Sequence, residues 1–278
     1  MSVAGAVTRA ARPATLVSGL RELVVTGVCV ACYPFGVGSQ PPLDGDGSGE
    51  PAADEPAADP APLVRTTPVL LVHGYGHNRS GWMFVERHLR RAGFDQVATM
   101  NYSPFCRDLS RVALDLADRV DALRRTTGAE RVHLVGHSLG GILIRYYVQL
   151  LGGDTSVATV VTIASPHEGT AAGHLLPVWI LEQLRPDSWV IRALAQTARP
   201  GSVRWVAYYS DLDVLVQPGR SAMLRHPALA ATNVLVKDHG HMSMLLSPGL
   251  GRSISRQLAA TDAPGELLTP TGQPACRR

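Results

Sequence analysis

Short, continuous runs of apolar residues recur between residues 68 and 237, and each is bounded by glycine or polar residues. Such runs are typical of strands buried on both faces of a parallel sheet. The segments between them carry apolar residues at every third or fourth position, as amphipathic helices do. The alternation therefore predicts an α/β fold with a doubly wound, mostly parallel sheet and right-handed crossovers.

The expected elements follow one another in the order strand, helix, strand. We expect strands at 68–74, 97–103, 132–136, 157–165, 205–209 and 233–237, and helices at 84–91, from 109 to a stop at Gly128, and at 139–151. Hydrophobic residues make up 45% of the 278, which is enough to build the core of such a sheet and excludes a wholly disordered protein.

The interval 166–203 breaks this rhythm, because it is much longer than the dozen or so residues that a crossover needs. Its apolar residues fall into short helical groups. Ligands of such sheets bind at the carboxyl ends of the strands, so an insertion after a strand is placed to cover the site. We expect a small cap or lid here, with an ordinary crossover helix as the alternative.

Residues 1–38 combine scattered arginines with an uncharged apolar run from Leu23 to Gly38. The run is short for a membrane span and contains Pro34. Two interpretations stay open, an export signal and a helix that packs on the domain or lies at a membrane surface. The expected location is accordingly secreted or membrane-associated, with the cytoplasm as the alternative.

Residues 39–62 carry six acidic residues, six prolines and no basic residue, which predicts a disordered linker. One folded domain is expected over 63–261, followed by a tail at 262–278. Without the linker the chain is more basic than its net charge of +3. An anionic membrane surface is one partner that fits this charge, and scattered, solvated arginines are the alternative explanation. The charge pattern gives no support for nucleic-acid binding. We expect a monomer.

The segment GHSLG at 136–140 matches the pattern G-x-S-x-G between an expected strand and an expected helix. A sharp turn of this kind leaves no room for side chains at Gly136 and Gly140. It presents the hydroxyl of Ser138 above the sheet at a helix N-terminus, where developing negative charge is favoured. Ser138 is therefore the candidate nucleophile.

A serine hydroxyl needs a base to take its proton, and that base needs an acid partner. Two polar clusters follow later strands, one with Asp211 and Asp213 and the other with His239 and His241. Asp213 precedes an apolar stretch that can turn it inward, whereas Asp211 could cap the turn. We expect His241 to open the C-terminal helix. We assign Asp213 and His241, with Asp211 and His239 as the alternatives.

An acyl-transfer intermediate also needs two backbone N–H donors for its oxyanion. One is expected at Leu139, directly after the nucleophile, and the other in the loop 73–82, at Tyr75. Asn78 and Arg79 are expected to hold that loop rather than to contact substrate.

Other polar residues have structural interpretations. We expect His137 to pack or to form hydrogen bonds rather than to react, and 165–170 to shape a turn. Cys29 and Cys32 lie in the apolar run as small hydrophobes. No H-E-x-x-H or Cys/His ligand spacing is present in the sequence, so no metal site and no cofactor are expected.

Six segments together resemble one family. They are HGYGHNRSGW (73–82), NYSP (101–104), GHSLGG (136–141), SPHEGT (165–170), SDLD (210–213) and GHMSM (240–244). Over about residues 67–260 the chain is similar to the α/β-hydrolase lipases and esterases of actinobacteria. The resemblance implies Ser138 as nucleophile, Asp213 as acid and His241 as base, with the Tyr75 and Leu139 N–H groups as oxyanion donors. It also implies an ester substrate of the acylglycerol kind and no cofactor.

The expected function is thus a serine carboxylic-ester hydrolase that acts on lipids or other apolar acyl esters. An acyltransferase or a short-chain esterase with the same three residues is one alternative, because all share the acyl-enzyme. A noncatalytic, membrane-associated protein that retains the fold is the other. Large apolar side chains in 166–203, such as Trp179 and Trp189, favour long-chain esters and lipid surfaces.

Overall fold

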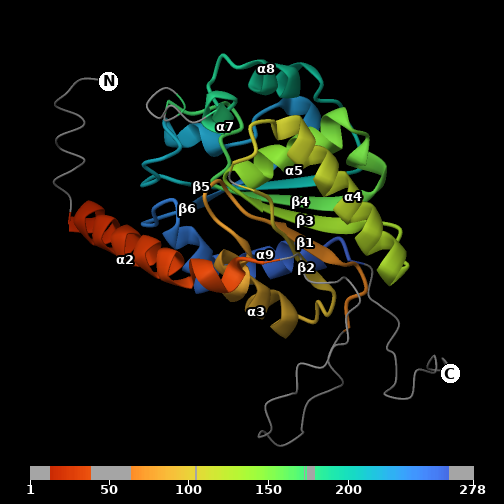
Figure 1. Cartoon of the computed structure of the whole chain (residues 1–278), viewed down its shortest axis with the longest axis horizontal. Coiled ribbons are helices and arrows are strands. Elements are labelled where there is room, and N and C mark those ends of the chain that lie inside the picture. Colours follow the sequence, from red (N-terminus) through yellow and green to blue (C-terminus); the bar gives the residue numbers. More distant parts are fainter. Residues whose placement is uncertain (1–12, 39–63, 104, 172, 174–178, 263–278) are drawn as a thin grey trace, which may run out of the picture.

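The computed structural model describes residues 13–38, 64–103, 105–171, 173 and 179–262 (Figure 1). The expected linker at 39–62 lies outside the described residues, as does the expected tail apart from Asp262.

Six parallel strands form one sheet within the described residues, in the order β2-β1-β3-β4-β5-β6. The strands are β1 (Val69–Val72), β2 (Val97–Met100), β3 (Val132–His137), β4 (Val157–Ile163), β5 (Arg204–Ser210) and β6 (Thr232–Val236). Every neighbouring pair is parallel. The predicted parallel α/β architecture is confirmed.

Three predicted strands were too long by two or three residues at their carboxyl ends. The expected strands at 68–74, 97–103 and 157–165 end at Val72, Met100 and Ile163. After Ile163 the chain leaves the strand conformation, because Ala164 has a φ of 50°. In the other two, the Tyr102 hydroxyl donates to the His73 carbonyl at 2.7 Å and the two rings stack. These residues bond to each other instead of extending the ladder.

Helices cover both faces of the sheet (Figure 1). One face carries α4 (Leu109–Thr127) and α5 (Leu139–Leu150), and the other carries α3 (Met83–Arg91) and α9 (Pro248–Ala259). Asp108 caps α4 at its start by accepting from the Ser110 N–H. Gly128 ends the helix in the left-handed conformation, and this stop was predicted from the sequence.

The core consists of two apolar layers, one on each side of the sheet. Leu70 and Val72 belong to the layer under α4 and α5, whereas Val69 and Leu71 belong to the layer against α3 and α9. All four side chains are fully buried. Because alternate residues of a strand face opposite sides, a strand covered on both sides must be apolar throughout.

Short 3-10 helices connect these elements. They are η1 (Arg79–Trp82), η2 (Gly153–Thr155), η3 (Gly219–Ala222), η4 (Pro227–Leu229) and η5 (Ser243–Leu246). The interval after β4 contains two short helices, α7 (Trp179–Glu182) and α8 (Trp189–Gln196), rather than one crossover helix. Ile180 and Val190 of these helices are buried in the α5 layer. Trp179 and Trp189 are exposed.

The N-terminal apolar run forms α2 (Pro13–Gly36), which lies beside the domain near α3 (Figure 1). Val25 is buried, and Leu20 and Leu23 face solvent. Within the described ranges, no helix combines the length and the apolar character needed to cross a bilayer. That the segment serves as an export signal stays a prediction.

Candidate active site

Ser138 stands at a sharp turn between β3 and α5, with φ 54° and ψ −120°. A positive φ is uncommon for a residue with a side chain and marks a backbone that its surroundings hold in place. A Cβ added to Gly140 would lie 2.1 Å from the Val72 carbonyl oxygen, and one on Gly136 would lie 2.6 Å from the Gly141 nitrogen. Only glycine fits at these two positions.

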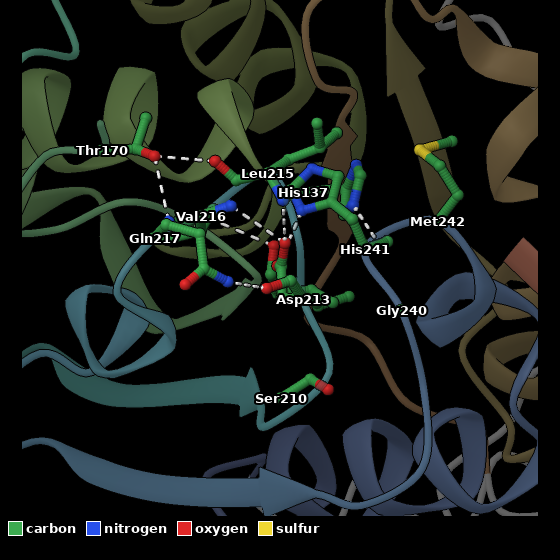
Figure 2. A network of polar contacts seen from close by, with 12 residues as sticks. His137, Thr170, Ser210, Asp213, Leu215, Val216, Gln217, Gly240, His241 and Met242 are labelled. Atoms are coloured by element: carbon green, nitrogen blue, oxygen red, sulfur yellow. Dashed lines mark hydrogen bonds and ion pairs between the residues drawn. The ribbon is translucent and has the colours of Figure 1, made fainter. Parts of the chain in front are cut away.

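His241 and Asp213 form a buried pair (Figure 2). The His241 Nδ1 lies 2.8 Å from the Asp213 Oδ2, and both residues are almost fully buried. The other carboxylate oxygen accepts from the N–H groups of Leu215 at 2.8 Å and Val216 at 2.9 Å. With its Nδ1–H directed at the carboxylate, a neutral imidazole keeps Nε2 free to accept a proton.

The loop that carries the acid is held by two further residues. The Thr170 hydroxyl donates to the Leu215 carbonyl at 2.7 Å and accepts from the Gln217 N–H at 3.1 Å. The Gln217 side chain donates to the Asp213 carbonyl (Figure 2). The segment 165–170, expected to shape a turn, thus braces the acid loop.

The two alternative residues lie apart from this pair. Asp211 is exposed. His239 is partly buried, and its Nδ1 lies 2.7 Å from the Lys237 carbonyl rather than from a carboxylate. Of the four candidates, the structure therefore brings together Asp213 and His241.

The expectation that His241 opens the C-terminal helix is wrong. His241 lies in the loop between β6 and η5, and α9 begins only at Pro248. The Ser247 side chain accepts from the Leu250 N–H, and proline occupies the first helical turn. Both features favour a helix start at this point rather than at His241.

His137 connects the nucleophile turn to the base. Its Nε2 lies 3.1 Å from the His241 carbonyl oxygen, and the two ring centroids are 4.8 Å apart. Burial holds the pKa of His137 well below its usual range, and the charges of His241 and His77 lower it further. A neutral His137 can donate its Nε2–H to that carbonyl, so the predicted hydrogen-bonding role is confirmed.

The loop after β1 comes close to the nucleophile turn. A Cβ on Gly74 would lie 3.0 Å from the Ser138 Cβ. Tyr75 follows in this loop, and Leu139 is the first residue of α5. Their N–H groups thus belong to the two segments that meet at Ser138, and their role as oxyanion donors stays a prediction.

Asn78 and Arg79 hold this loop, as the sequence predicts. The Asn78 Oδ1 accepts from the Ser80 N–H at 3.0 Å, and its Nδ2 donates to the Tyr33 carbonyl of α2 at 2.7 Å. The Arg79 N–H donates to the Asn101 side chain at 2.9 Å.

His73 lies under the loop and stacks on Tyr102, with ring centroids 4.2 Å apart and planes 8° from parallel. Burial lowers the pKa of His73 to about 4, against a smaller opposing effect of its contact with the Gly74 carbonyl. His73 is therefore neutral at neutral pH and serves as a packing element of the site.

Sequence reasoning missed a carboxylate from the N-terminal helix. The Glu22 side chain accepts from the N–H groups of Met242 and Ser243, the two residues after His241. Some 220 residues separate these groups, and no local pattern marks such a contact.

In the part of the chain that the structure describes, no three His, Cys, Asp or Glu residues are grouped so that they could hold a metal ion. A cavity of about 300 Å³ lies between the end of α2 and the loop after β1, lined in part by Tyr33, His77 and Tyr102.

Comparison with known proteins gives a family match over residues 67–185, to the family described as alpha/beta hydrolase fold. The matched segment contains Ser138 and ends before Asp213 and His241.

Curated relatives with similar sequences include three proteins named triacylglycerol lipase. The one from Vibrio cholerae is 33% identical over 39% of this chain and 35% of its own length. The one from Burkholderia plantarii is 33% identical over 46% of this chain and 38% of its own length. The one from the actinobacterium Pseudarthrobacter phenanthrenivorans is 32% identical over 37% of this chain and 34% of its own length. The aligned segment thus spans little more than a third of these relatives.

Solved structures share the fold over most of the domain. The mature lipase BlEst2 of Bacillus licheniformis superimposes with a TM-score of 0.60 at 17% identity, over 75% of this chain and 96% of that one. Lipase B of Aspergillus fumigatus superimposes with a TM-score of 0.59 at 18% identity, over 71% of this chain and 53% of that one. The chain therefore has the α/β-hydrolase fold and is a distant homologue of bacterial proteins named triacylglycerol lipase.

Proposed function

We propose that the protein is a serine carboxylic-ester hydrolase of the lipase and esterase kind, with Ser138 as nucleophile, His241 as base and Asp213 as acid. One observation carries the proposal. The buried His241–Asp213 pair lies at the same edge of the sheet as the strained turn of Ser138, and the neighbouring His137 contacts His241. The distant homology to proteins named triacylglycerol lipase supports the same reaction class.

The reaction follows from the roles of these three groups. The Ser138 oxygen attacks the acyl carbon while the His241 Nε2 takes its proton. The C=O bond becomes a single bond, and the N–H groups of Tyr75 and Leu139 stabilise the resulting oxyanion. When the C=O bond reforms, the ester C–O bond breaks and the alcohol leaves with the proton from His241. Water then attacks the acyl-enzyme by the same route, which releases the acid and restores Ser138.

Asp213 acts through the base. His241 becomes an imidazolium each time it accepts a proton, and the carboxylate 2.8 Å from its Nδ1 stabilises that charge. The Leu215 and Val216 N–H groups keep the carboxylate in place. The charge thus develops beside a fixed partner rather than in water.

An apolar ester substrate and a lipid surface are part of the proposal. Large apolar side chains stand exposed on the elements after β4 and after the acid, among them Trp179, Trp189 and Val214. Burial of each in a lipid surface would contribute about 1.5–3 kcal/mol before opposing costs. A cell-envelope or secreted location would give access to such surfaces.

Covalent labelling tests the proposal. A fluorophosphonate should modify one peptide, the one that contains Ser138, and Ser138→Ala should abolish both labelling and hydrolysis of p-nitrophenyl esters. An adduct on a different serine, with none on Ser138, would refute the assignment. Flotation with vesicles and a series of acyl lengths test the substrate class. Activity that falls steadily above butyrate, without flotation, would indicate a short-chain esterase instead.

A further inference from the structure

The helix α2 contacts the loop that carries the proposed base. The Glu22 Oε1 accepts from the Met242 N–H at 2.5 Å, and the Oε2 accepts from the Ser243 N–H at 3.0 Å. The neighbouring Arg21 donates from Nη1 to the Asp238 carbonyl at 3.0 Å. Three hydrogen bonds from one turn of α2 therefore reach residues on both sides of His241.

The loop is shaped to receive this carboxylate. A Cβ added to Gly240 would lie 2.3 Å from the Glu22 Oε2, so a larger residue at this position would displace the carboxylate. Gly240 precedes His241 directly. The absence of a side chain there lets the loop close around Glu22.

One peptide group explains why this contact concerns the base. The His241 carbonyl and the Met242 N–H belong to the same planar peptide unit. The oxygen of that unit lies 3.1 Å from the His137 Nε2, and its N–H donates to Glu22. Because both ends of a rigid plane are held, the rotation of the backbone at His241 is fixed. The imidazole direction is then set by Asp213 at Nδ1.

The other end of α2 is held by the loops that follow β1 and β2. The Asn78 Nδ2 donates to the Tyr33 carbonyl at 2.7 Å, and the Asn101 Nδ2 donates to the Gly36 carbonyl at 2.9 Å. A Cβ on Gly36 would lie 2.0 Å from the Asn78 Oδ1. The helix thus contacts both the base loop and the loop that contains Tyr75, beside the sheet edge where they meet (Figure 1).

We infer that Glu22 is a positioning residue for His241 and that α2 is a working part of the active site. The inference rests on the proposed function. The carboxylate does not touch substrate; it acts by fixing the peptide unit that follows the base.

Three full-length variants test this inference. Glu22→Ala removes both acceptors, Glu22→Gln keeps one, and Leu23→Ala changes a side chain of the same helical turn that is 73% exposed. Misplacement of a catalytic group by about 1 Å can cost on the order of a hundredfold in rate. With p-nitrophenyl butyrate we expect Glu22→Ala to lower kcat at least tenfold with little change in KM. The kcat of Glu22→Gln should lie between those of Glu22→Ala and the wild type, and the kcat of Leu23→Ala should match the wild type.

Three measurements separate positioning from loss of folding. The kcat is expressed per Ser138 that a fluorophosphonate labels to completion, so unfolded molecules do not count. The proton NMR signal of the His241 Nδ1–H should shift or broaden in Glu22→Ala, because the Asp213–His241 geometry is no longer fixed. Amide hydrogen exchange at Met242 and Ser243 should accelerate in the same variant and stay unchanged in Leu23→Ala.

The outcomes are distinct. If Glu22→Ala keeps the wild-type kcat, NMR signal and amide exchange, the inference is overturned. If the wild type neither hydrolyses esters nor labels at Ser138, the proposed function fails. In that case the amide exchange and the NMR signal of Glu22→Ala still test the anchoring of the loop by Glu22. If both match the wild type, the anchoring is overturned, and if both change, it is supported.

Discussion

Replacement of Asp213 by Asn tests the acid most directly, because the structure fixes how the amide must sit. The carboxylate accepts three hydrogen bonds, from His241 Nδ1 and from the N–H groups of Leu215 and Val216. An Asn side chain has one acceptor and one donor group. If its NH₂ faced the two backbone N–H groups, these would be left unpaired, at a cost of about 1–3 kcal/mol each.

The amide oxygen of Asp213→Asn will therefore face Leu215 and Val216, and its NH₂ will face His241. The imidazole must then accept at Nδ1 and carry its proton on Nε2, which cannot take a proton from Ser138. A wrong tautomer of this kind lowers kcat by about ten-thousand-fold. That ratio corresponds to about 5.5 kcal/mol of transition-state stabilisation.

Initial rates with p-nitrophenyl butyrate measure the effect, and thermal unfolding shows that the variant is folded. Asp211→Asn is the matched control, since it makes the same chemical change two residues away at an exposed position. We expect it to stay within twofold of the wild type. A loss of less than tenfold in Asp213→Asn, or a larger loss in Asp211→Asn, would refute the reasoning.

Three further predictions concern stability. Gly140→Ala places a Cβ 2.1 Å from the Val72 oxygen and should lower the free energy of unfolding by about 1–3 kcal/mol or more, whereas Gly27→Ala, with open space around it, should raise it by about 0.5–1 kcal/mol; urea titration compares the two. Burial lowers the pKa of His133 to about 4, so the unfolded chain binds its proton first as the pH falls. The stability that His133 contributes is full above about pH 6.5 and is lost as the pH falls towards 4. In His133→Leu the urea midpoint should therefore change less with pH over that range, and a pH dependence equal to that of the wild type would contradict this. The buried Arg145 donates to two backbone carbonyls, so Arg145→Met should cost about 2–3 kcal/mol; a loss below 0.5 kcal/mol on urea unfolding would count against this role.

The sequence predicted most of the sheet because burial on both faces leaves a direct record in residue type. Strands such as Val157–Ile163 must be apolar at every position, and that signal is local. The turn at Ser138 was equally accessible, since glycine is the only residue that fits beside it at 136 and 140. Burial determines the first feature and steric exclusion the second, and both restrict the residue type at single positions.

Contacts over long sequence distances left no such record. The strand expected at 97–103 ended early because Tyr102 bonds to His73, which directly follows a different strand, β1. The apolar stretch after Asp213 favoured it over Asp211, but the contact with His241 itself joins residues 28 positions apart and leaves no pattern in the sequence. Glu22 is one acidic residue in a helix, and its partners lie at the other end of the chain.

The contact between α2 and the base loop also constrains when the site forms during synthesis. Glu22 and Ser243 are 221 residues apart, so a growing chain displays the carboxylate long before its partner emerges from the ribosome. Closing so large a loop is entropically costly and late relative to local structure. The turn of Ser138 can thus fold while the base still lacks its anchor. If α2 positions the base as proposed, full hydrolytic activity arrives only when α2 and the base loop meet, so the full kcat reports that this long-range contact has formed.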